Sequence, residues 1–262
     1  MTRIYVCVFV GILVIITGLV ASNLLQSLRA QKPRITVACV GDSITSHGCA
    51  SSNNKTYVAQ LGQILGPEYN VRNFGVSGQT MLKAGLCGQA NSCGGDCSYW
   101  TKSFEKAIQS QPHIVTIMMG TNDAKGCNWY GPPNGSPSGL GVEFRSAYLD
   151  MISQFHSLPT KPKVYIMVPP PLTNPPNRPN DPPPFNMSSH VINDQFGWLH
   201  RSIMMESGAD GLIDIWTALG GVQGFFHDDM SCDGCHPKDK AMTIIAKTIA
   251  TTITAGYSAA IQ

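Results

Sequence analysis

The sequence predicts an α/β domain built in three layers, with a mainly parallel β-sheet between two layers of helices. Five short apolar segments of β-type composition alternate along the chain with longer segments of helical character. The strand segments are largely apolar at odd and even positions alike, which is typical of strands covered by helices on both faces. Of the 262 residues, 43% are hydrophobic and only 13% are charged, so the chain can bury one sizeable core.

The predicted elements follow one another in βαβ order. The segments predicted as strands are Arg34–Val40, Val71–Phe74, Ile114–Met119, Val164–Val168 and Leu212–Ile215. The segments predicted as helices are Tyr57–Leu65, Tyr99–Gln109, Val142–His156, Val191–Met205 and Asp239–Thr252. Because a helix separates successive strands, the strands can run parallel through crossover connections. Three loops rich in Gly, Pro or Ser, at 85–98, 126–141 and 169–189, are expected beyond the carboxyl ends of the strands, where ligands bind.

The first thirty residues differ from the rest of the chain. A basic start at Arg3 precedes an apolar run, Ile4–Ala21, that ends in small residues, as in a cleaved signal peptide. The run is almost long enough to cross a bilayer, so an uncleaved signal anchor is the alternative. The positive charges after it, Arg29, Lys32 and Arg34, would then favour a cytoplasmic body. We therefore expect a signal peptide or anchor at 1–30 and one catalytic domain at 31–262.

Cysteines and glycosylation sequons favour the secretory route. Cys7 lies inside the apolar run, which leaves an even number of cysteines for an oxidising compartment. These are Cys39, Cys49, Cys87, Cys93, Cys97, Cys127, Cys232 and Cys235. Their pairing stays open, and Cys39, in a predicted buried strand, is a candidate free thiol. Asn-x-Ser/Thr sequons at Asn54, Asn134 and Asn186 fall in predicted loops or at loop edges.

The charge pattern excludes one class of partner. The formal net charge is +2, and Lys and Arg form no run in the interior of the chain. Proteins that bind nucleic acid rely on clustered positive charge. No nucleic-acid partner is therefore expected.

Polar residues follow each of the first three predicted strands. Ser43, in Gly-Asp-Ser, would open a helical turn, where the helix dipole favours a developing alkoxide, although Asp and Ser are also ordinary helix caps. Gly75 could present its N–H to a substrate oxygen, and Ser77 nearby is a rival nucleophile whose Gly-x-Ser pattern lacks the second glycine of a nucleophile elbow. The amide of Asn122 could donate to an oxyanion or form an Asx-turn.

A late loop, 232–237, adds an acid and a base. Asp233 and His236 are three residues apart just before the last predicted helix. His236 could take the Ser43 proton while Asp233 holds the imidazole tautomer. Asp228 and Asp229 are alternative acids if another register of the loop applies.

The same loop has two other interpretations. It could be a surface loop whose cysteines are disulfide-bonded, and oxidised cysteines would rigidify it. Cys232, Cys235 and His236 could also bind a metal ion, but no second Cys-x-x-Cys or His-x₃-His completes a tetrahedral site, so no metal is expected.

The order of the four segments resembles the SGNH, or GDSL, hydrolase family, over about Ile35 to Thr252. The resemblance implies a flavodoxin-like three-layer fold with a five-stranded parallel sheet in the order 2-1-3-4-5. It implies a catalytic triad of Ser43, Asp233 and His236, and no cofactor. The implied oxyanion hole consists of the Ser43 N–H, Gly75 and Asn122. Ile44 stands where the family name implies Leu.

The segments 71–82 and 120–123, with Asn128 and Trp129 nearby, are similar to the carbohydrate acetylesterase branch of that family, which includes sialate O-acetylesterases and acetylxylan esterases. A serine esterase that hydrolyses acyl esters, above all acetyl esters of small or polymeric carbohydrate, is therefore expected, with the Pro-rich loop 169–189 as a wall of its pocket. A lysophospholipase- or thioesterase-like acyl hydrolase is one alternative. A non-catalytic, membrane-anchored glycan-binding protein is the other. The oligomeric state stays open.

Overall fold

The computed structural model describes residues 34–85, 97–130 and 140–258. Its strands are β1 (Ile35–Gly41), β2 (Tyr69–Gly75), β3 (Ile114–Met118), β4 (Lys163–Val168) and β5 (Gly211–Asp214). They form one sheet in the order β2-β1-β3-β4-β5, and every neighbouring pair is parallel. The predicted fold class and strand order are confirmed.

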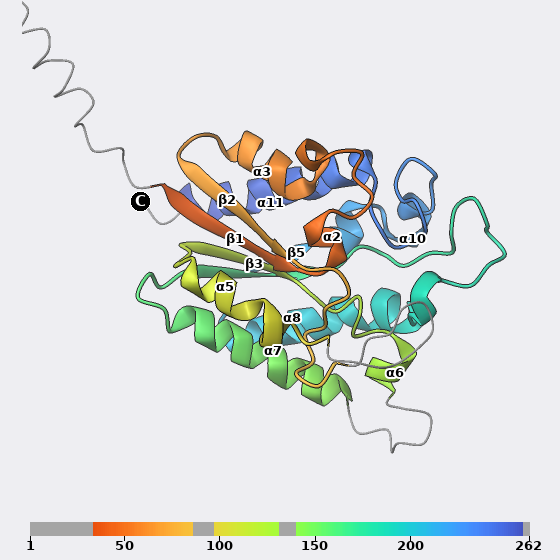
Figure 1. The fold of residues 1–262 in the computed structure, drawn as a ribbon, viewed down its shortest axis with the longest axis horizontal. Coiled ribbons are helices and arrows are strands. Elements are labelled where there is room, and N and C mark those ends of the chain that lie inside the picture. The colour runs from red at the N-terminus through yellow and green to blue at the C-terminus, as the bar shows by residue number, and fades with distance from the viewer. Residues whose placement is uncertain (1–33, 86–96, 131–139, 259–262) are drawn as a thin grey trace, which may run out of the picture. The chain divides into compact units, whose positions relative to one another are not determined.

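Helices cover both faces of the sheet (Figure 1). The longest are α3 (Tyr57–Leu65), α7 (Leu140–His156), α8 (Phe196–Ser207) and α11 (Asp239–Ser258). The shorter ones are α2 (Ser43–Ser46), α4 (Tyr99–Lys102), α5 (Phe104–Gln109), α6 (Gly126–Trp129), α9 (Ile215–Ala218) and α10 (Gly221–Phe225). Single turns of 3₁₀ or π type lie at η1 (Asn53–Lys55), η2 (Pro184–Asn186) and η3 (His190–Gln195). Helices α3 and α11 lie on one face, and α5, α7 and α8 on the other.

Alternate residues of the strands supply two separate cores. Ala38 and Val40 of β1 pack with α5, α7 and α8, whereas Val37 and Cys39 pack with α3 and α11, and all four are fully buried. Cys39 is a free thiol, as the sequence suggests. The edge strand β2 departs from the two-sided apolar pattern and exposes Arg72 and Asn73, because an edge strand is covered less completely than a central one.

Two predicted helices are interrupted. The segment 99–109 forms α4 and α5, with a break at Ser103, where φ is −128°. The buried Ser103 hydroxyl donates to Gln79 Oε1 at 2.7 Å, a tertiary contact that local propensity does not reveal. The segment predicted from Val191 begins as the π turn η3 and becomes regular only at α8.

The carboxyl end of β1 leads directly into α2. A Cβ atom on Gly41 would lie 2.0 Å from Thr45 Oγ1 and 2.9 Å from the Met118 carbonyl oxygen. Only glycine therefore lets α2 fold back this closely against the sheet. This turn places Ser43 at the carboxyl edge of the parallel sheet, where ligands bind in open α/β folds.

The prediction of a signal peptide or anchor at 1–30 lies outside the described residues. Across 34–85, 97–130 and 140–258, no helix combines the length and apolarity needed to cross a membrane.

Replacing Gly41 by Ala should destabilise the fold by about 1–3 kcal/mol, because the new methyl group must displace Thr45 or the Met118 carbonyl. The matched control is Gly62→Ala in α3, where the Cβ atom would meet Val71 at an ordinary 3.6 Å and should stabilise by up to about 1 kcal/mol. Urea unfolding of both variants measures the difference. Equal midpoints would show that the turn tolerates a side chain.

Candidate active site

Ser43 is the first residue of α2, and its neighbour Asp42 caps that helix. Asp42 Oδ1 accepts a hydrogen bond from the Ile44 N–H at 2.9 Å. Of the two side chains that the sequence offers as caps, Asp42 takes this role. The Ser43 hydroxyl is thereby left to face the late loop.

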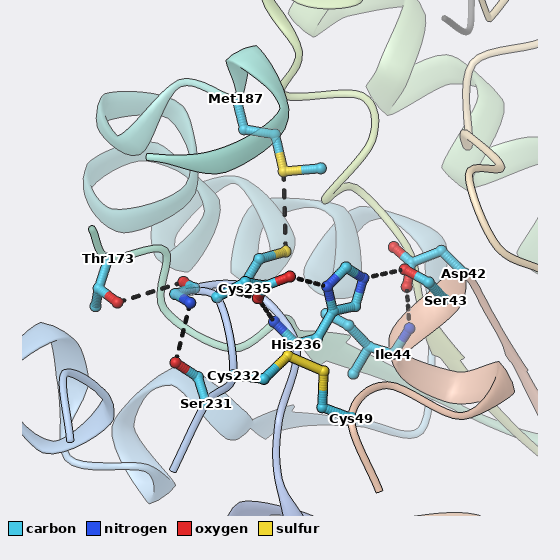
Figure 2. Close-up of polar contacts among 12 residues, drawn as sticks. Asp42, Ser43, Ile44, Cys49, Thr173, Met187, Ser231, Cys232, Cys235 and His236 are labelled. Atoms are coloured by element: carbon cyan, nitrogen blue, oxygen red, sulfur yellow. Dashed lines mark hydrogen bonds and ion pairs between the residues drawn. A yellow bond between two sulfur atoms is a disulfide. The ribbon is translucent and has the colours of Figure 1, made fainter. Parts of the chain in front are cut away.

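The late loop brings His236 to that hydroxyl. Ser43 Oγ and His236 Nε2 lie 2.9 Å apart, although the residues are 193 positions apart in sequence (Figure 2). The other ring nitrogen, Nδ1, lies 2.7 Å from Asp233 Oδ2. The structure thus joins the three predicted triad residues in one chain of hydrogen bonds.

Asp233 is held in place by its own loop. Its Oδ1 accepts the backbone N–H groups of Cys235 at 2.9 Å and His236 at 2.7 Å. Gly234 adopts a φ of 89°, and a Cβ there would lie 2.3 Å from the Thr173 carbonyl oxygen. Both its conformation and the close approach of segment 173–174 therefore require glycine. The Thr173 N–H donates to the Gly234 carbonyl at 2.9 Å and ties the two loops together.

The other acids of this region do not reach His236. Asp228 and Asp229, the alternative acids of the sequence analysis, pair instead with the exposed side chains of Lys238 and Lys240. Asp233 is the carboxylate that contacts the imidazole.

The electrostatics of the site suit a histidine base. Burial by itself lowers the pKa of His236, but the hydrogen bond and charge of Asp233, together with the charge of Asp42, outweigh it and raise that pKa above its ordinary value. For Asp233, burial raises the pKa, yet its bonds to His236 dominate and lower it, so Asp233 is the ionised partner. Burial raises the pKa of Asp42 to about 6, against the opposing Ile44 N–H and the charge of His236.

Ser43 and His236 open into a cavity of about 530 Å³, a size usual for small-molecule sites. It is lined by Ser43, His47, Gly48, Cys49, Ser77, Gly78, Asn122, Lys125, Phe185, Met187 and His236. Asn122 donates one amide hydrogen to the Gln79 carbonyl oxygen at 3.1 Å, and its second amide hydrogen has no acceptor among the described residues. Ser77 shares the cavity, but the hydroxyl that His236 contacts is that of Ser43.

The structure does not bring Gly75 to the cavity. Its N–H donates to Asn73 Oδ1 at 2.8 Å, and a Cβ there would lie 2.2 Å from the Ser46 nitrogen, so this glycine lets β2 end against α2. Gly78, three residues later, lines the cavity instead. It adopts a φ of 79° in a turn closed by the Gln79 N–H and the Val76 carbonyl. The described residues provide no partner for its N–H.

The sequence-based selection also misses Phe185, Met187 and Lys125, which line the cavity. Phe185 and Met187 come from the Pro-rich loop, which therefore walls the cavity as predicted. The Phe185 ring meets the His236 ring edge to face, with 5.5 Å between centroids. Phe185 also has a left-handed φ of 62°, which is unusual for a bulky residue. Lys125 follows Asn122 by three residues, and that closeness was the only available signal.

A disulfide joins the two halves of the site. Cys49, just after α2, is bonded to Cys232, at the start of the acid–base loop, across 183 residues (Figure 2). Cys235 is a free, buried thiol that contacts the Met187 sulfur at 3.9 Å. Of the two cysteines that flank the predicted acid, only Cys232 is thus oxidised.

Comparison with known proteins identifies the family of the chain. The sequence model of the GDSL-like lipase/acylhydrolase family matches residues 39–244. The chain belongs to this family. It is 31% identical over 251 residues to an acetylxylan esterase of Xylanibacter ruminicola; the match covers 88% of this chain but 46% of that protein, so the chain spans about half the length of the curated relative.

Solved structures share the fold of this chain. The carbohydrate acetylesterase Est24 from Sinorhizobium meliloti superposes with a TM-score of 0.59 at 19% identity, over 85% of this chain and 99% of that one. The native aryl esterase of M. smegmatis gives a TM-score of 0.60 at 16% identity, over 84% and 98% of the two chains. At these identities the likeness concerns the fold alone.

Replacing both Cys49 and Cys232 by Ser should lower the free energy of unfolding by about 2–5 kcal/mol, because the bond closes a long loop of the unfolded chain. Denaturant unfolding measures this loss. The control is Cys235→Ser, which removes a sulfur from the same loop and no cross-link. A double variant that unfolds at the wild-type denaturant concentration would contradict the expectation.

Proposed function

We propose that the protein is a serine esterase that hydrolyses acyl esters, with acetyl esters of carbohydrate as its substrates. The observation that carries the proposal is the hydrogen-bonded chain from Ser43 Oγ through His236 to Asp233, which opens into a cavity. Membership of the acylhydrolase family supports ester hydrolysis, and the acetylxylan esterase relative supports acetyl groups on sugars.

In the first half-reaction Ser43 Oγ attacks the ester carbonyl and His236 Nε2 accepts its proton, which the 2.9 Å contact allows. Asp233 fixes the Nδ1–H tautomer and stabilises the imidazolium that forms. Collapse of the tetrahedral intermediate breaks the ester C–O bond. His236 returns the proton to the departing alcohol, and the acyl group stays on Ser43.

In the second half-reaction water replaces the alcohol. His236 takes a proton from water as it attacks the acyl-enzyme carbonyl. The bond to Ser43 Oγ then breaks, and the proton goes back to that oxygen. The products are a carboxylic acid and the free alcohol, and neither half-reaction requires an oxidant or a reductant.

Three donors would stabilise the oxyanion. They are the Ser43 N–H at the start of α2, the free amide hydrogen of Asn122 and the N–H of Gly78. We assign this last role to Gly78 in place of Gly75, because the Gly75 N–H is already bonded to Asn73. Each such donor contributes about a hundredfold or more to the rate of comparable enzymes.

We expect short acyl groups to fit best, because the apolar side chains of Phe185 and Met187 line the cavity and the Phe185 ring lies edge to face against His236. A lysophospholipase- or thioesterase-like hydrolase would need room for a long chain. A purely glycan-binding protein would have no use for an imidazole bonded to both a hydroxyl and a carboxylate. Comparing acetyl with long-chain esters distinguishes the first alternative.

We further propose that the protein follows the secretory route. The Cys49–Cys232 bond suits an oxidising compartment, and Cys97 and Cys127 are disulfide-bonded as well. The sequons at Asn54 and Asn186 lie on exposed residues, whereas the one at Asn134 lies outside the described residues. The leader at 1–30 remains a proposal of the same kind.

Replacing Ser43 by Ala should abolish labelling by a fluorophosphonate and lower kcat for an acetyl ester by at least about a thousandfold, because the nucleophile is lost. Ser77→Ala is the matched control, since Ser77 lines the same cavity without being the hydroxyl bonded to His236, and it should keep labelling and activity. The measurements are gel fluorescence and acetate release. Labelling that survives in the Ser43 variant and disappears in the Ser77 variant would refute the assigned nucleophile.

The pH dependence follows from the pKa of His236. The base must be neutral, so kcat/KM should rise with pH through a pKa above the ordinary histidine value. In Asp233→Asn the hydrogen bond and charge that raise this pKa are gone, so the titration of His236 should move to lower pH. Maximal kcat should also fall, by about 10³–10⁴-fold. NMR titration of the imidazole tests the shift, and a pKa equal to or above that of wild type would be inconsistent with it.

A further inference from the structure

Lys125 is a buried cation that lines the proposed catalytic cavity and has no ion-pair partner among the described residues. The residue is only 8% exposed, yet it lines the cavity together with Ser43, Asn122 and His236. No hydrogen bond or ion pair reaches its ammonium group from the described parts of the chain. Burial lowers the pKa of Lys125, and the neighbouring Cys235 and Asp42 oppose that shift only in part.

The backbone fixes Lys125 where it is. Lys125 forms an antiparallel bridge with Met187 of the Pro-rich loop, and its carbonyl accepts the N–H groups of Asn128 and Trp129 at 2.9 Å each, at the start of α6. The Lys125 side chain therefore starts from a backbone position that is fixed by hydrogen bonds. The charge of Lys125 also acts on His236. It opposes the carboxylates that raise the pKa of His236, so the ammonium group lies within electrostatic range of the reaction centre.

Nothing in the described lining of the cavity competes for this charge. The lining includes no Asp and no Glu; its other ionisable groups are His47 and His236. The carboxylate whose charge acts on Lys125 is that of Asp42, which is fully buried and accepts a hydrogen bond from the Ile44 N–H. An anion entering the cavity would thus meet a positive group without meeting a negative one on the wall.

We propose that Lys125 forms a subsite for a carboxylate, so that the preferred substrate is an acetyl ester of an acidic sugar such as a uronic acid. This inference rests on the esterase function proposed above and names the class of its substrate. Because Lys125 and Ser43 line one cavity, the carboxylate and the acetyl ester belong to the same sugar or to adjacent sugars. Lysine suits this role as a compact point charge that bonds a carboxylate oxygen strongly once both are desolvated.

Two matched substrates isolate the charge. One is the methyl glycoside of glucuronic acid carrying a single O-acetyl group, and the other is the same glycoside with its carboxylate converted to a primary amide. The two differ in charge and hardly in shape. Acetate release gives kcat and KM for each, with 4-nitrophenyl acetate as a general ester substrate.

Three variants isolate the residue. Lys125→Met keeps the length of the side chain and removes the charge, whereas Lys125→Arg keeps the charge. Lys247→Met removes one positive charge from an exposed position on α11, so it controls for net charge. Thermal unfolding of each variant checks that the fold is retained.

Wild type should prefer the acid over the amide by about 10- to 100-fold in kcat/KM, mainly through KM. Lys125→Met should erase that preference, so that the ratio of kcat/KM for the acid to kcat/KM for the amide falls to about one. Lys125→Arg should restore part of it, and Lys247→Met should not change it.

Three results would overturn the subsite. One is a wild-type enzyme that cleaves both sugars equally well. Another is an equal loss of activity on both sugars in Lys125→Met, which would assign Lys125 to the reaction centre or the fold. The third is an unchanged preference in that variant. Failure of wild type on every acetyl ester, 4-nitrophenyl acetate included, would instead refute the esterase function itself.

Discussion

The 2.9 Å contact between Ser43 Oγ and His236 Nε2 joins residues 193 positions apart, and most of the structure described here serves to hold its two ends. One end is fixed by β1, by the absence of a side chain at Gly41 and by the Asp42 cap of α2. The other is fixed by α11, whose start follows the loop that contains Asp233. The Cys49–Cys232 bond then links these ends directly, so neither can drift from the other without strain.

Two buried carboxylates, those of Asp42 and Asp123, form hydrogen bonds that fix the segments at the carboxyl edge of the sheet. Asp42 caps α2, while Asp123, just past β3, accepts the N–H groups of Met81 at 3.0 Å and Leu82 at 2.8 Å. Burial raises the pKa of Asp123 to about 7, against those two bonds. The segment after β2 is thereby tied to the segment after β3. That tie positions Gly78 and Asn122 on the same cavity, although they follow different strands.

The local sequence pattern was enough to predict the α/β architecture, but it did not predict where helices are interrupted. The apolar runs of β1 and β3 and the order of elements predict a parallel α/β sheet, because burial on both faces leaves a visible composition. The break at Ser103 depends on a hydrogen bond to Gln79, 24 residues earlier, which no local propensity encodes. Gly75 and Gly78 look equivalent in sequence. They differ because the Gly75 N–H is bonded to Asn73, whereas Gly78 lines the cavity.

The sequence by itself predicted the strands and their parallel direction and singled out the hydroxyl, imidazole and carboxylate, because residue types and their order along the chain are one-dimensional information. The order of the strands in the sheet came from the resemblance to the SGNH family. Only the tertiary structure decided that Cys232 pairs with Cys49 and leaves Cys235 free, that Gly78 and not Gly75 lines the cavity, and that Lys125 lines it without an ion pair from the described residues. These facts depend on distances between segments far apart in the chain. Such distances arise only when the sheet and its loops pack together.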